Sequence, residues 1–130
     1  MVDEANLETH GIWGQLVNDP LWHDAYLERA DRMVARDRNH AAIIIWSMGN
    51  EAGLGVNIED MATHVRAKDT SGRLIHYECR VSEGDQSPSP LGDIIANMYV
   101  SRERMVELSN IDPSRPVIST SRVTNLFLLS

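Results

Sequence analysis

One short apolar run constrains the fold more than any other feature of this sequence. Residues 41–46 read Ala-Ala-Ile-Ile-Ile-Trp, and Ser47-Met48-Gly49-Asn50-Glu51 follows directly. A continuous apolar run of this length, rich in β-branched residues, is typical of a strand buried on both faces, and such strands occur mainly in parallel sheets. The run therefore predicts the central strand of a parallel sheet.

Weaker strand patterns and helical patterns alternate along the rest of the chain. A first helix is expected to begin at Asn18-Asp19-Pro20, where a capping side chain precedes a proline in the first turn, and to run to about Asp37. The other expected helices cover about 57–68 and 102–109, and the other expected strands cover 2–4, 74–77, 94–99 and 117–119. This alternation favours βα units, so the predicted fold class is α/β, a parallel sheet with flanking helices.

The expected sheet is incomplete. The pattern supplies four full strands and only the end of a fifth, at residues 2–4. The chain begins almost on acidic residues, and it ends in an apolar tail without capping or turn residues, 123–130. Both ends are therefore expected to be cut from a longer sequence.

Composition narrows the class of protein. The 130 residues include 12 basic and 19 acidic ones, for a net charge of −7. This length allows about one domain, and the acidic balance argues against nucleic acid as the main partner. The single Cys79 excludes an internal disulfide. No apolar run approaches the roughly 20 residues of a membrane span, and the first residues do not resemble a signal peptide. We expect a cytoplasmic protein with no membrane partner.

The strongest candidate site lies where the central strand ends. The strand delivers Asn50 and Glu51 to its carboxyl end, which is where ligands bind in parallel α/β folds. A carboxylate there, near the apolar Trp46, could have a raised pKa and act as a general acid. The alternative is that Glu51 caps the glycine-rich turn that follows, and the pattern alone leaves both interpretations open.

A second candidate is the acidic segment near the N-terminus. Glu8 and His10 are two residues apart, so they point to the same side of an extended segment. A carboxylate and an imidazole at that spacing could form half of a metal site. The alternative, an exposed acidic loop, is the one that the pattern alone favours.

Two more residues end expected strands. Tyr99 closes the strand 94–99, and Glu78 closes the strand that begins at residue 74. For Tyr99, the pattern favours a tyrosine packed under a loop. For Glu78, it favours a position outside any cleft. His76, like the other histidines apart from His10, shows no ligand spacing and is expected at a surface or interface.

Several segments together resemble one family. Residues 37–51 are similar to the acid/base signature of glycoside hydrolase family 2, and Asp3-Glu4-Ala5-Asn6 and Glu8-Thr9-His10-Gly11 resemble its β-galactosidase branch. Met98-Tyr99 and residues 112–118 follow in the family's order. The resemblance covers about residues 2–118.

The resemblance implies a fold and a set of roles. The fold would be a partial (β/α)8 TIM barrel covering about strands three to seven, in residues 2–118, followed by a divergent apolar tail, residues 119–130. The chain would be a fragment of a retaining hydrolase of terminal β-galactosides such as lactose. Glu51 would be the acid/base, Asn50 and Tyr99 would bind substrate, and Glu8, His10 and Glu51 would hold Mg²⁺.

The sequence also departs from the family pattern. The family's nucleophilic glutamate would fall at Ser121, and residues 120–124 contain no carboxylate. Cys79-Arg80 replaces a glycine-rich stretch. We therefore expect the chain alone to be inactive. The alternative function is a noncatalytic module that binds a sugar, or that complements another chain supplying the missing barrel strands, and exposed sheet edges would also favour self-association.

Overall fold

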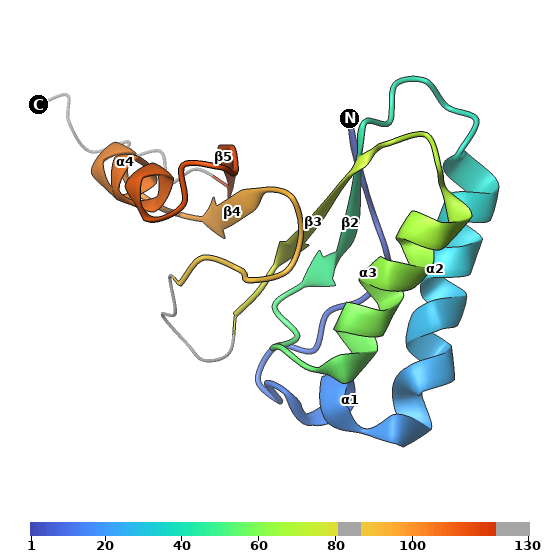
Figure 1. Cartoon of the computed structure of the whole chain (residues 1–130). Coiled ribbons are helices and arrows are strands. Elements are labelled where there is room, and N and C mark those ends of the chain that lie inside the picture. Colours follow the sequence, from blue (N-terminus) through green and yellow to red (C-terminus); the bar gives the residue numbers. More distant parts are fainter. Residues whose placement is uncertain (81–86, 122–130) are drawn as a thin grey trace, which may run out of the picture.

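The computed structural model describes residues 1–80 and 87–121. The described strands and the longer helices follow one another in the predicted order, and a short helix near the N-terminus, at residues 15–18, was not predicted (Figure 1). The elements are β1 (Val2–Glu4), α1 (Gln15–Asn18), a 3₁₀ turn (Pro20–Trp22), α2 (His23–Asp37), β2 (Ile45–Asn50), α3 (Val56–Lys68), β3 (Leu74–Glu78), β4 (Ile95–Met98), α4 (Arg102–Ile111) and β5 (Val117–Ser121). The predicted boundary at residue 118 falls inside β5, and residues 122–130 of the predicted tail lie outside the described residues.

All strand pairing is parallel, as predicted, but the strands form two sheets. The first has the order β1-β2-β3 and the second contains β4 and β5. Between them, the backbone N–H of Ile75 donates to the carboxylate of Asp93 at 2.7 Å, and the N–H of Asp93 donates to the carbonyl of Ile75 at 2.8 Å. The Asp93 carboxylate thus accepts the hydrogen bond that a neighbouring strand would otherwise accept from Ile75. The described residues form a partial barrel rather than a closed one.

Helices α2 and α3 cover one face of the first sheet (Figure 1). Each helix buries an apolar stripe at helical spacing. The stripes are Tyr26, Ala30, Met33 and Val34 on α2, and Ile58, Met61, Ala62 and Val65 on α3. They pack with Trp46, Met48, Ile75 and Tyr77 of the strands to form the main core. The side chains of β2 and β3 that alternate with these four face away from the helices.

The central strand begins later than predicted. It starts at Ile45, and the residues before it include the turn that follows α2, in which the N–H of Ile43 is bonded to the carbonyl of His40. Ile43 is buried but Ile44 is exposed, so the apolar run is not buried along its whole length. The face opposite the helices is buried but polar, since Ser47, His76 and Glu78 occupy it.

Across residues 1–80 and 87–121, no helix is both long enough and apolar enough to span a membrane.

Candidate active site

The backbone fixes Glu51 at the carboxyl end of β2. Its N–H donates to the carbonyl of Glu78 at 3.0 Å, and the N–H of Asn50 donates to the carbonyl of Leu7 at 2.9 Å. Glu51 has a φ of 44°. Gly49, with a φ of 123°, lets Leu7 approach closely, because a Cβ there would lie 2.6 Å from the Leu7 carbonyl oxygen. Three chain segments therefore converge on Glu51.

Positive φ values mark two of the predicted site residues. Among the residues that the structure describes, Glu51 and Tyr99 are the only non-glycine residues with positive φ, at 44° and 58°. Backbone strain of this kind costs about 1–3 kcal/mol and tends to gather at functional sites. Each of these residues follows directly on the end of a strand, β2 or β4, although Tyr99 is half exposed and belongs to the second sheet.

The Glu51 carboxylate is buried among basic and donor groups. Its Oε1 lies 2.9 Å from Nη1 of Arg80. Its Oε2 accepts a hydrogen bond from Nδ2 of Asn50 at 3.4 Å and lies 4.0 Å from Nε2 of His10. These contacts run to the adjacent Asn50 and to two other segments, at His10 and Arg80, rather than into residues 52–55, so they do not match the capping interpretation of Glu51.

The predicted metal ligands are only partly brought together. His10 approaches Glu51, while Glu8 is exposed and forms a backbone bridge with Asn50. Within the described ranges, no three His, Cys, Asp or Glu side chains gather closely enough to hold a metal ion. As arranged, these side chains do not form a complete magnesium ligand set, and the magnesium assignment stays a prediction.

The inner face of the sheets carries a polar chain that the sequence did not suggest. Ser47 Oγ donates to Oε2 of Glu4 at 2.7 Å and lies 3.0 Å from Nδ1 of His76. Because the single hydroxyl proton goes to Glu4, Nδ1 of His76 must donate to Ser47. Nε2 of His76 is then a buried acceptor, without a partner in the part of the chain that the structure describes. Burial lowers the pKa of His76 to about 4.

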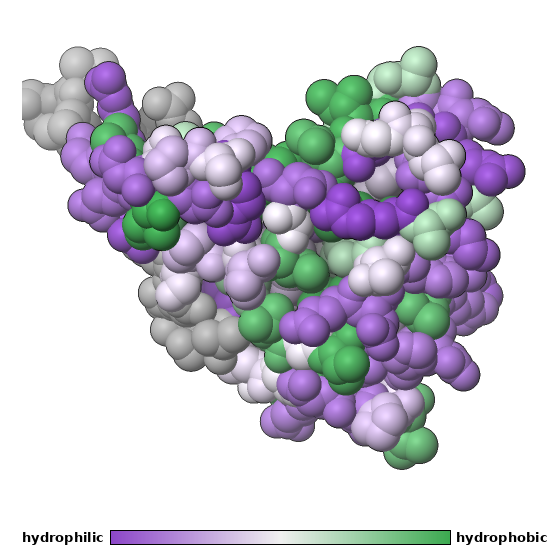
Figure 2. All heavy atoms as spheres, viewed as in Figure 1, coloured by the Kyte–Doolittle hydropathy of each residue, from purple (hydrophilic) through white to green (hydrophobic). Residues whose placement is uncertain are grey.

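His76 was expected at a surface or interface, but it is only 3% exposed. With Glu4, Asn50 and Glu78 it lines a cavity of about 530 Å³ between the two sheets, and Figure 2 shows the molecule hollowed between these two parts. The other lining residues are Val2, Met98, Ile118, Ser119 and Thr120. From the sequence, the spacing of residues 76 and 78 along one strand could have predicted that both lie on the same face. It could not have predicted that a second sheet covers that face.

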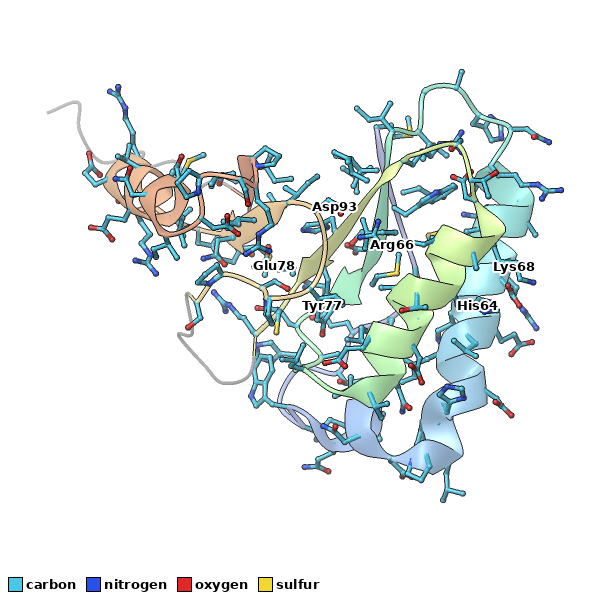
Figure 3. All side chains as sticks on the ribbon, in the orientation of Figure 1. His64, Arg66, Lys68, Tyr77, Glu78 and Asp93 are labelled. Carbon is cyan, nitrogen blue, oxygen red and sulfur yellow. The ribbon has the colours of Figure 1, made fainter. Side chains whose placement is uncertain are left out.

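Glu78 is the second carboxyl group of the site. Figure 3 shows it on the side of β3 that faces the second sheet. It is 2% exposed and accepts a hydrogen bond from Thr120 at 3.1 Å, while its Oε1 has no partner within the described residues. Burial raises the pKa of Glu78 to about 7 and the charge of Glu51 adds to the rise, although hydrogen bonds from Thr120 and Met98 oppose it. The sequence pattern favoured a position outside any cleft for Glu78, whereas the residue lines the cavity between the two sheets.

A parallel βα arrangement with carboxyl groups gathered at the strand ends is the layout of a barrel glycosidase site. The model of the glycosyl hydrolases family 2 TIM barrel domain matches residues 1–124. The chain belongs to this family, which confirms the predicted resemblance and fold class.

Three relatives illustrate the match. The chain is 50% identical over 101 residues to a β-galactosidase of Aeromonas hydrophila, covering 76% of this chain and 9% of that protein. It is 44% identical over 114 residues to one of Leuconostoc mesenteroides, covering 85% and 10%. It is 38% identical over 127 residues to one of Priestia megaterium, covering 91% and 12%. The chain thus spans about a tenth of the length of the curated relatives it matches.

Proposed function

We propose that this chain is a central segment of the catalytic barrel of a retaining β-galactosidase and that Glu51 is its acid/base. The observation that carries the proposal is the placement of Glu51. It lies at the carboxyl end of a parallel strand, at a φ of 44°, with a buried carboxylate held from two sides. The names of the relatives supply the substrate class, terminal β-galactosides.

The reaction assigns definite roles to these side chains. A retaining glycosidase needs two carboxyl groups about 5 Å apart, one that protonates the leaving oxygen and one that attacks the sugar. Glu51 would give its proton to the leaving oxygen and later take one from water. Asn50, whose amide lies beside the Glu51 carboxylate, would bind the sugar 2-hydroxyl, and Tyr99 would contact the sugar from the second sheet.

No residue of this chain is assigned the role of nucleophile. Position 121, where the family's glutamate would fall, is a serine, and a serine attacks only when a base activates it. Magnesium, when bound, would add positive charge beside the acid/base. Glu8, His10 and Glu51 would hold it weakly, because the ion demands near-octahedral geometry and usually keeps several waters.

The chain alone is expected to hydrolyse no galactoside. Acid catalysis without a nucleophile leaves half of the mechanism missing. The test is an assay of the purified chain with a chromogenic galactoside, alongside Glu51→Gln. Turnover that the Glu51→Gln variant loses would contradict the expectation, whereas turnover equal in both proteins would come from a contaminating enzyme.

A second candidate function is a complementing module that pairs with a chain supplying the missing barrel strands. The inner cavity favours it, because two of its lining residues, His76 and Glu78, each carry a buried polar atom, Nε2 and Oε1, that has no partner within the described residues. Buried polar atoms normally have partners. Within the described residues, β1 also leaves one edge of its sheet unpaired.

Self-association of the isolated chain is the expected result of that geometry, because unpaired strand edges readily join other strands. Size-exclusion chromatography with light scattering at low micromolar concentration tests it. A sharp monomer peak with cooperative thermal unfolding would show that the chain closes its own edges. The apolar tail that could shield one edge, at residues 126–129, lies outside the described residues.

A further inference from the structure

The side chain of Arg80 ends directly on the proposed acid/base. Its Nη1 lies 2.9 Å from Oε1 of Glu51, and the side chains of Arg80 and Glu51 are 12% and 10% exposed. Arginine side chains are mostly exposed, and those that are largely buried are usually paired. The charge of Arg80 is therefore directed at one carboxylate rather than spread into solvent.

The backbone explains why residue 80 reaches this position. The N–H of Glu51 is bonded to the carbonyl of Glu78, so the end of β2 is tied to the end of β3 two residues before Arg80. A glycine-rich stretch, which the family resemblance places here, would leave this space without a charge. The arginine is thus a feature of this chain's own sequence.

The pairing changes what a divalent cation would meet at Glu51. Oε1 already faces a guanidinium, and Oε2 faces Asn50 and His10. An ion coordinated by Oε1 would have to displace Arg80 or lie close to a fixed positive charge. In a buried site such repulsion is poorly screened, and magnesium gives up its own waters reluctantly.

We propose that Arg80 is a positioning residue that supplies the positive charge beside Glu51 and keeps divalent cations off this carboxylate. The proposal rests on the proposed function only where it calls Glu51 the acid/base. The ion pair itself belongs to the geometry of the chain.

The test is calorimetric titration of the full chain with magnesium chloride. Arg80→Gln is expected to tighten magnesium binding by about tenfold or more, the scale on which groups around metal ligands act. Arg80→Lys, which keeps the charge, should bind as weakly as the wild type. The gain should disappear in the double variant Arg80→Gln, Glu51→Gln.

Arg104→Gln is the matched control. Arg104 also pairs with a carboxylate at 2.9 Å, that of Glu107 on α4, so its replacement removes the same charge away from Glu51. An equal gain in this control, or no gain in Arg80→Gln, would overturn the proposal.

A second variant covers the case in which Arg80→Gln fails to fold. The wild type itself should bind magnesium weakly, and Glu51→Gln should weaken that binding only a little further, because Arg80 already occupies Oε1 of Glu51. Tight wild-type binding that Glu51→Gln abolishes would overturn the proposal. The readout of this test is cation binding, not turnover. If a reassembled enzyme shows no galactosidase turnover, that result counts against the proposed function and does not bear on the proposal for Arg80.

Discussion

Alanine in place of Gly49 is expected to lower the free energy of unfolding by about 2–5 kcal/mol, from backbone strain together with overpacking. Gly49 has a φ of 123°, and a Cβ there would lie 2.6 Å from the carbonyl oxygen of Leu7 and 3.0 Å from its Cβ. Leu7 cannot withdraw freely, because its carbonyl accepts the N–H of Asn50 at 2.9 Å. A loss of this size is a large share of the roughly 5–15 kcal/mol that stabilises a typical domain.

Gly72→Ala is the matched control for Gly49→Ala. Gly72 also has a positive φ, 82°, but a Cβ there would meet no atom within 4 Å. Its replacement should cost only the left-handed backbone strain, about 1–2 kcal/mol. Urea unfolding of all three proteins at one fixed concentration gives the comparison, since association ties stability to concentration. Equal losses in the two variants would show that the contact with Leu7 carries no weight.

The Glu78→Gln variant is expected to remove a pH-dependent loss of stability. The pKa of Glu78 rises from 4.5 to about 7 on folding, so the unfolded chain loses this proton at a lower pH than the folded chain does. The contribution of Glu78 is therefore most favourable below pH 4.5, falls as the pH rises to about 7, and is constant above that. The fall is on the order of 3 kcal/mol.

The measurement compares variants, because His76 acts in the opposite direction. Its pKa is lowered from 6.5 to about 4, so its contribution grows over nearly the same pH range. Relative to the wild type, Glu78→Gln should gain stability between pH 4.5 and about 7. Glu59→Gln, a change at an exposed glutamate of α3, should follow the wild-type curve. A Glu78→Gln curve parallel to the wild type would contradict the assignment.

Local patterns predicted the elements of this fold well. Helix α2 was expected to end at Asp37, where it does end, because its stripe of Tyr26, Ala30, Met33 and Val34 keeps helical spacing to that point. The position of Asn50 and Glu51 at a strand end also followed from the run before them. These features depend on residues close together in sequence.

The features that could not be predicted depend on distant contacts. Sequence alternation places His76 and Glu78 on one face, but their burial depends on β4 and β5 lying over that face. The contact of Arg80 with Glu51 joins residues 29 positions apart through the register of β2 and β3. The division into two sheets depends on the carboxylate of Asp93 reaching the N–H of Ile75, 18 residues away.

That division also determines where the segment deforms most easily. Along a ladder, repeated backbone hydrogen bonds resist shear over the whole length of two strands. Within the described residues, the hydrogen bonds that join β3 to the second sheet lie at the two ends of β3, at Asp93 and at Glu78, which accepts from Thr120 and Met98. Arg66 of α3 steadies the first of these from outside, at 2.8 Å from Asp93 (Figure 3).

Because Glu51 follows β2 of the first sheet and Tyr99 follows β4 of the second, bending at this joint would change the separation of these two residues. The geometry of any site that uses both residues therefore depends on the contacts that hold the two sheets at a fixed angle.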